Sequence, residues 1–172
     1  VPDAIHDGVL LAALALDAVC QSALADREQW VERLTAGQYV AAPLAESAFD
    51  LEQASDGTAR LTGLAAGVQS ADRASHALVW TSAGDCVALA PLDRAGVTIV
   101  ARPTWDATHR LFDLRFTGME LDGALVLARG TVAQALVRRL VTLRDLGLAA
   151  DAVGGANALL DLTVEHLQVR RQ

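Results

Sequence analysis

The strongest constraint on this fold is a helical apolar pattern that begins near Thr131 and still repeats where the sequence ends at Gln172. Leu159, Leu160, Val164 and Leu167 recur at helical spacing, and no Gly, Asn or Pro follows them as a stop signal. Such a stripe must be buried against a partner. Because the sequence also begins at Val1 rather than at Met, we expect a piece of a longer protein.

Three glycines lie inside this helical pattern: Gly147, Gly154 and Gly155. A glycine in a helix interior costs about 1 kcal/mol relative to alanine. We therefore expect them to allow close packing against another helix. The helix would belong to a bundle that this chain does not complete.

The first forty residues also predict helices. Residues 4–20 have a broad apolar face, and a second helix begins after Asp26 as its N-cap. In that second helix Trp30 and Leu34 lie one turn apart and should point inward, and Gly37 should end it.

Between the helical regions the pattern changes to short β-branched and aromatic runs bounded by turn residues. The expected strands are 39–44, 58–64, 77–82, 86–91, 97–102, 111–117 and 125–127. Links such as Asp56-Gly57 and Gly84-Asp85 are too short for parallel crossovers, so antiparallel pairing is expected. The predicted fold is α+β: N-terminal helices (1–38), a small antiparallel β-barrel or sandwich (39–128), and the start of a helical domain (129–172).

Composition excludes several classes of protein. The net charge is −7 and all 14 cations are Arg, scattered singly or in doublets, which does not suit a nucleic-acid partner. The apolar run 8–16 is too short to cross a membrane and has acidic rather than basic flanks. We expect a soluble, cytoplasmic protein. Cys20 and Cys86 lack metal or disulfide spacing and are expected to be buried thiols.

Few polar residues suggest chemistry by themselves. The four histidines, His6, His76, His109 and His166, share no ligand spacing and are expected at the surface or at edges. Asp106, Thr108 and Arg110 fit an Asx turn with a charge pair. No metal site is predicted.

Three strings resemble the acyl-CoA dehydrogenase family. Residues 154–156 and 166–172 resemble its G-G-A … Y-x-x-x-R-x-Q-F-G helix, without the final Phe-Gly. Residues 96–98, 105–110 and 114–118 resemble its G-V … D-x-T-R … V-x-F-x-G-V hairpin, and residues 30–40 resemble its W-L-x-x-L-A-x-G-E segment. The three occur in the family's order and together cover nearly the whole chain.

The resemblance implies a helical domain, a β middle domain and a C-terminal helical bundle. It implies FAD as cofactor and an acyl-CoA thioester as substrate, from which a Glu base removes the α proton while the flavin accepts the β hydride. It also implies a dimer or heterotetramer with a homologous subunit, in which Arg170 reaches the flavin pyrophosphate of the neighbour. A solvated Arg at a frayed helix end is the alternative.

The family's first flavin loop, T-E-P-x-A-G-S-D, is poorly kept. Its counterpart here is 45–52, preceded by Leu44, in which only Glu46 matches. Ala45 has no hydroxyl group to donate, and Asp50 and Glu52 place negative charge where a pyrophosphate would lie.

The second flavin strand, G-x-K-x-W-I-T-N-A, is matched by 63–71. Gly67 stands for the stacking Trp, Gln69 for the Thr near flavin N5, and Ser70 for the next residue. Losing a ring that buries about 150–250 Å² removes a large apolar contact. Leu44, Ala45, Gln69 and Ser70 are therefore degenerate flavin positions, and weak or absent flavin binding is expected.

No catalytic residue is expected within this chain. Glu165, one turn from Asp161, fits a solvated residue better than a base. The leading hypothesis is a non-flavin-binding acyl-CoA dehydrogenase-like subunit in a hetero-oligomer, inactive alone and serving fatty acid or steroid catabolism. The alternatives are a competent FAD-dependent dehydrogenase with atypical flavin loops and a non-enzymatic interaction module that retains the fold.

Overall fold

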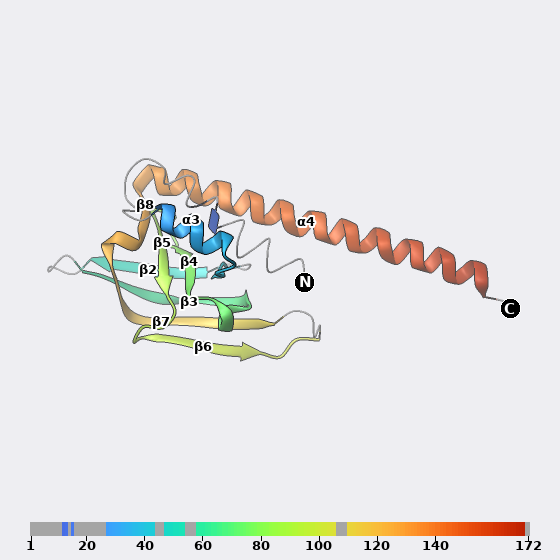
Figure 1. Ribbon diagram of the computed structural model, residues 1–172, viewed down its shortest axis with the longest axis horizontal. Helices are drawn as coiled ribbons and strands as arrows, with labels where there is room; N and C mark the ends of the chain where they lie inside the picture. Colours follow the sequence, from blue (N-terminus) through green and yellow to red (C-terminus); the bar gives the residue numbers. More distant parts are fainter. Residues whose placement is uncertain are drawn as a thin grey trace.

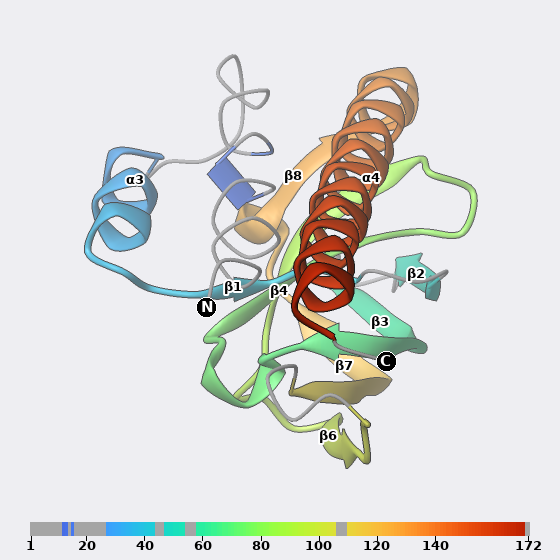
Figure 2. The ribbon, with the colours of Figure 1, turned by 90° about the vertical axis from the view of Figure 1, so that its right-hand side faces the viewer.

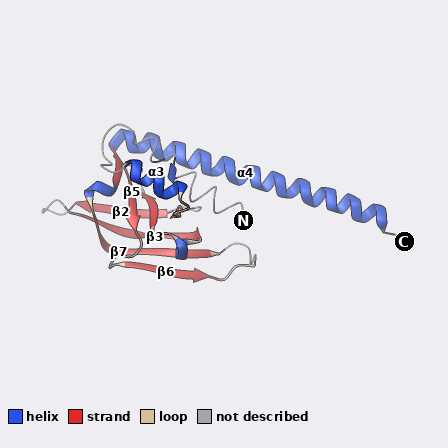
Figure 3. Ribbon diagram, viewed as in Figure 1, coloured by secondary structure: helices blue, strands red, loops and turns tan. Residues whose placement is uncertain are grey.

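The computed structural model describes residues 12–13, 15, 27–43, 47–53, 58–105 and 110–170. Figures 1 and 3 show a β unit beneath one very long helix. In chain order the elements are α3 (Arg27–Thr35), β1 (Val40–Ala41), β2 (Ser47–Gln53), β3 (Ala59–Gln69), η2 (Ala71–Arg73), β4 (His76–Trp80), β5 (Cys86–Pro91), β6 (Val97–Arg102), β7 (Leu111–Leu121), η3 (Gly123–Leu125), β8 (Val126–Arg129) and α4 (Gly130–Val169).

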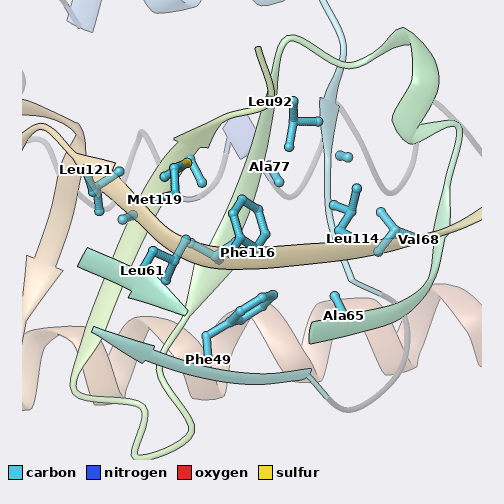
Figure 4. Close-up of a cluster of buried hydrophobic side chains, with 14 of the residues drawn as sticks. Phe49, Leu61, Ala65, Val68, Ala77, Leu92, Leu114, Phe116, Met119 and Leu121 are labelled. Carbon is cyan, nitrogen blue, oxygen red and sulfur yellow. The ribbon is translucent and has the colours of Figure 1, made fainter. Parts of the chain in front are cut away.

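The strands form two four-stranded sheets. One has the order β1-β4-β5-β8 and the other β2-β3-β7-β6. Apolar residues from both sheets meet in one buried cluster, so the β unit is a sandwich. Phe49, Leu61, Leu114, Phe116 and Met119 fill its centre, as Figure 4 shows. The expected α+β architecture with a small β sandwich is confirmed.

A second apolar cluster covers the other face of the first sheet. Trp30 and Leu34 of α3, and Ala133, Leu136 and Leu140 of α4, are buried there against that sheet. Strand β5 therefore lies between two cores, and all six of its residues are buried.

The expectations for α3 are confirmed where the structure describes them. Trp30 and Leu34 are its buried pair. The helix ends at Thr35, followed by Gly37 at φ +90°, whose N–H donates to the Leu34 carbonyl. Asp26, and all of the expected 4–20 helix except residues 12, 13 and 15, which are helical, lie outside the described residues.

Two predictions about the strands are wrong. The segment 45–52, matched to the family's flavin loop, is not among the expected strands, but Ser47–Gln53 forms β2 and pairs antiparallel with β3 from Ser47↔Ala65 to Gln53↔Ala59. Strand β1 pairs with β4 in parallel, at Val40↔His76 and Ala41↔Ala77, not antiparallel. Both depend on distant pairing partners, which local patterns do not reveal. Most of the remaining strands, β5 and β6 included, lie where expected.

Helix α4 packs on the sheet only through its first turns. From Asp145 to Arg170 every residue except Gly147 is exposed, and Figures 1 and 2 show the helix extending past the β unit. Gly154 and Gly155 have no atom within 4 Å of an added Cβ. No neighbour within the described chain explains these two glycines, so the close helix packing expected there stays a prediction. Within the described residues, no helix is long and apolar enough to cross a membrane.

Candidate functional site

The end of β3 gathers the residues matched to the family's flavin strand. The β3–β7 register shifts between Ala65 and Val68, so residues 66 and 67 bulge opposite Asp113. Gly67 takes φ +67° there, and its N–H donates to Asp113 Oδ1 at 3.1 Å. Glycine adopts this backbone conformation without steric cost.

Arg102, at the end of β6, completes this arrangement. Its guanidinium lies 3.4 Å from Asp113 Oδ1, and its Nη1 would lie 4.0 Å from a Cβ placed on Gly67. We call this set, Arg102 with Asp113 and Gly67, the clasp. It joins the edge strand β6 to the bulge in β3 across β7 and puts a cation beside the bulge.

Gln69 is the one buried polar residue found among the described residues, with 9% of its surface exposed. Its backbone carbonyl accepts from Tyr39 Oη at 3.1 Å. Within the described part of the chain, its side-chain amide makes no hydrogen bond. A buried amide without a hydrogen-bond partner costs about 1–3 kcal/mol of folding free energy. The Gln69 amide is therefore suited to hydrogen-bond with a polar group from outside the described residues.

Ser70 turns the chain out of β3. It has a left-handed φ of 48°, and its N–H donates to the Arg110 carbonyl at 2.8 Å. Arg110 forms an ion pair with Asp72 of η2 and lies over the Phe112 ring, 5.7 Å from its centroid. Within the described residues Arg110 thus has Asp72 as a carboxylate partner, and Asp106 and Thr108 of the expected Asx turn lie outside the described residues.

The first flavin segment is only partly described. Leu44 and Ala45 lie outside the described residues. Of the rest, Phe49 is fully buried in the sandwich core, and Asp50 pairs with Thr62 in the β2–β3 ladder. From Ser47 onward this segment is therefore an extended edge strand paired with β3, not a loop.

Arg170 lies at the C-terminal end of α4, as its C-cap, and is exposed. Its own N–H donates to the His166 carbonyl at 3.0 Å. Since the described α4 leaves the sheet after its first turns, the end that carries Arg170 stands apart from the clasp and Gln69 (Figure 1). Of the candidate flavin residues that the structure describes, Arg170 is therefore not brought together with Gln69 and Ser70.

His76 packs against α3 rather than at an edge alone. Its ring meets Trp30 edge to face, with centroids 4.8 Å apart, and its Nδ1 lies 3.0 Å from Ser75 Oγ. Gln38 Nε2 donates to that same Ser75 oxygen at 2.6 Å. The Ser75 hydroxyl can then donate a hydrogen bond to Nδ1 of a neutral His76 imidazole.

This contact predicts that the packing of α3 on His76 loses stability in acid. Burial lowers the pKa of His76, which nearby Arg33 and Arg94 lower further and Asp93 raises. A group with a lowered folded pKa stabilises the fold above its unfolded pKa of about 6.5 and loses that contribution as the pH falls below it. Urea unfolding followed by tryptophan fluorescence should show stability falling from pH 7.5 to 5.5.

The matched variants are His76→Gln, which should flatten this slope, and His166→Gln on exposed α4, which should leave it unchanged. A slope that persists in His76→Gln would assign the effect to another group.

Other candidate sites are weak. Two surface depressions of about 750 and 360 Å³ are lined by neither Gly67 nor Gln69. Among the residues that the structure describes, no group of three or more His, Cys, Asp or Glu could hold a metal ion. Cys86 is a buried free thiol whose pKa is raised, chiefly by burial.

This chain matches known proteins by its structure and not by its sequence. No protein-family model and no curated protein matches the sequence. The butyryl-CoA dehydrogenase of Megasphaera elsdenii matches with a TM-score of 0.77 at 19% identity, over 95% of this chain and 49% of that one. Glutaryl-CoA dehydrogenase of Mycobacterium smegmatis matches with a TM-score of 0.75 at 20% identity, over 95% and 46%. This chain has the acyl-CoA dehydrogenase fold.

A third match is to the ChsE4–ChsE5 complex of Mycobacterium tuberculosis, with a TM-score of 0.72 at 24% identity over 93% of this chain and 44% of that one. The chain spans about half the length of these acyl-CoA dehydrogenase-fold structures. The fold expected from the three sequence strings is therefore confirmed over nearly the whole chain.

The residues at the matched positions show whether this chain could hold a flavin. The position matched to the stacking Trp is a glycine beside the Arg102–Asp113 ion pair, and the segment matched to the first flavin loop is a strand from Ser47 onward. Among the described residues at these positions, the side-chain amide of Gln69 is the group that suits a flavin edge. These residues do not fit a flavin ring stacked on Gly67.

Sequence reasoning did not identify the clasp, although part of its signal is visible. A glycine inside a strand pattern often marks a bulge, and Gly67 lies inside β3. The partners Asp113 and Arg102 come from β7 and β6. Only the register of three strands shows that they converge.

Proposed function

We propose that this chain is a subunit of an acyl-CoA dehydrogenase-like assembly that catalyses flavin-dependent α,β-dehydrogenation of an acyl-CoA thioester. The FAD is held by, or together with, a homologous partner subunit, and the chain alone is inactive. The observation that carries the proposal is the match of 95% of the chain to this fold together with the missing stacking side chain at Gly67.

The structural neighbours support the reaction class. One glutaryl-CoA dehydrogenase is described in complex with FADH2, and another with glutaryl-CoA. The ChsE4–ChsE5 neighbour is a complex of ChsE4 with ChsE5. Extending flavin, acyl-CoA and a homologous partner to this chain is our proposal, and the acyl group could be a fatty or a steroid chain.

The exposed half of α4 supports a partner. Leu146, Val153, Leu160 and Leu167 recur every seven residues, and each is more than 60% exposed. Residues at this spacing share one helix face. A second set of exposed apolar residues, Leu148, Leu159, Leu162 and Val169, lies on another side. Apolar surface on more than one side is what a helix inside a bundle presents.

Arg170 is the residue that we assign to the partner's flavin. A guanidinium is always charged and binds phosphate oxygens through two parallel hydrogen bonds. Arg170 is exposed at the end of α4, beyond the exposed apolar faces, so its guanidinium is accessible to a partner that covers α4.

The experiment that tests this proposal is flavin counting with and without a partner. The purified chain should show no flavin absorbance, whereas co-expression with a homologous flavoprotein subunit should give a flavin-containing, acyl-CoA-oxidising complex. Stoichiometric flavin on the chain alone would refute the partner role.

Arg170→Ala should weaken flavin binding in that complex by about tenfold to a hundredfold, because one charged hydrogen-bonding group contributes about 1.5–3 kcal/mol. Flavin release on dilution measures the loss. The control is Arg139→Ala, an exposed Arg near the start of α4, which should leave flavin retention unchanged. Equal retention in both variants would mean that Arg170 does not contact the flavin.

The second candidate is a competent dehydrogenase with atypical flavin loops. The buried amide of Gln69, which makes no hydrogen bond within the described residues, favours it, because this amide stands where the family places a hydroxyl near the flavin. Turnover of an acyl-CoA panel by the chain with its own bound flavin would select this candidate. A non-enzymatic module would bind neither flavin nor CoA with any partner.

A further inference from the structure

We propose that the clasp of Arg102, Asp113 and Gly67 keeps a flavin ring off this chain's own β unit. The inference rests on the proposed function, since it names the structural element that decides which subunit of the assembly carries the flavin. The missing tryptophan at Gly67 removes a contact that would favour a flavin. The clasp adds an unfavourable effect, which comes from Arg102 of β6 and Asp113 of β7.

The first step is the geometry of the bulge. Ala65 pairs with Leu114 and Val68 with Phe112, which leaves residues 66 and 67 facing Asp113 alone. The Asp113 carboxylate accepts from the Gly67 N–H and so holds the bulge in place. The bulge is therefore a defined structural feature that a side-chain hydrogen bond holds in place.

The second step is the position of the cation. Arg102 lies at the exposed edge, opposite Leu111 in the β6–β7 ladder, and reaches back to Asp113. A Cβ on Gly67 would lie 4.0 Å from its Nη1, an ordinary van der Waals contact. A longer side chain that extends from this position toward Arg102 would displace the guanidinium.

The third step is energetic. The side chains of Arg102 and Asp113 are 48% and 34% exposed, so both charges are partly hydrated. A flavin ring laid on Gly67 would remove that water without supplying a countercharge, and removing water from charged groups is unfavourable. Without an apolar ring at Gly67, no stacking contact offsets this cost.

A guanidinium can also stack on an aromatic ring. Arg102 could then serve as a platform for a flavin instead of excluding it. The two roles predict opposite effects of removing Arg102, so the direction of the change distinguishes them.

The test uses the full-length protein without a partner and follows added FAD by the quenching of its fluorescence. Gly67→Trp/Arg102→Ala restores a ring and opens the clasp. Its control, Gly67→Trp/Arg60→Ala, restores the ring and removes a different ion pair, Arg60–Glu120, between β3 and β7. Circular dichroism establishes that each variant is folded.

We expect no quenching with the wild type or the control, and an apparent affinity at least about tenfold higher with the open-clasp variant. Quenching by the wild type that Arg102→Ala weakens would overturn the proposal in favour of the stacking platform. An open-clasp variant that binds no better than the control would also overturn it.

A second measurement keeps the proposal testable if the double variants do not fold. Asp113→Asn weakens the Arg102 ion pair and the acceptor of the Gly67 N–H, so exchange of that amide should accelerate by about fivefold or more. The matched Glu120→Gln variant should leave it unchanged. Unaltered exchange in Asp113→Asn would show that the clasp does not hold the bulge.

The outcome is separable from that of the proposed function. FAD titration of this chain needs neither a partner nor an acyl-CoA. A chain that excludes flavin but supports no dehydrogenase with any partner would refute the proposed function and leave the clasp standing. A chain that supports an active complex with a flavoprotein partner, but binds FAD no better after the clasp is opened, would refute the clasp alone.

Discussion

Phe116→Ala should destabilise the protein by about 3–5 kcal/mol, the usual cost of removing a fully buried phenylalanine. Phe116 is 1% exposed and meets Phe49 edge to face, with ring centroids 5.6 Å apart (Figure 4). The two rings join β2 to β7 at the centre of the sandwich. Since domains are stable by only about 5–15 kcal/mol, this loss is a large share of the total.

Urea unfolding measures the effect as a lower midpoint at an unchanged slope. The control is Val100→Ala on the edge strand β6, where the side chain is 52% exposed and truncation should cost less than about 0.5 kcal/mol. If Phe116→Ala shifted the midpoint no further than Val100→Ala, the centre of the core would have to be placed elsewhere.

Gly63→Ala should cost about 2–4 kcal/mol, by combining backbone strain with overpacking. Gly63 has φ +152°, and an added Cβ would lie 2.2 Å from the Ala48 carbonyl oxygen and 2.8 Å from Phe49 Cα. Both are backbone atoms of the paired strand β2, which cannot move without breaking the ladder. In register, Gly63 lies between Phe49 and Phe116, so the missing side chain gives the two rings room to meet.

Gly154→Ala is the matched control, because an added Cβ there has no neighbour within 4 Å. In an isolated chain it should stabilise α4 by up to about 1 kcal/mol. Thermal unfolding of both variants tests the pair of predictions. A Gly63→Ala protein as stable as the wild type would mean that β2 does not lie against β3 as described.

The sequence predicted those parts of the fold that rest on local patterns. Trp30, Leu34 and Gly37 define α3 because a buried pair one turn apart and a C-terminal glycine act within a few residues of one another. Strands β5 and β6 were predicted at their observed bounds for the same reason.

The candidate site was predictable only in part. Gln69 and Ser70 lie in the structure at the end of β3, where the resemblance led us to look, and Arg170 lies at the end of α4. Strand β2 is absent from the expected strands, because 47–53 pairs with β3 over seven residue pairs that no local pattern shows. The roles of Gln69, Ser70 and Arg170 toward a flavin stay predictions, as do those of Leu44 and Ala45, which lie outside the described residues.

By itself, the sequence determined that α4 would be long and would carry apolar residues at helical spacing to its end, because this periodicity depends only on residues a few positions apart. That a partner covers these residues stays a prediction. Only the tertiary structure decided what surrounds Gly67. Asp113 and Arg102 lie 46 and 35 residues further along the chain, and they reach the bulge because β3, β7 and β6 are neighbours in one sheet. Strand order and register are properties of the whole sandwich, since they depend on which apolar faces can be buried together.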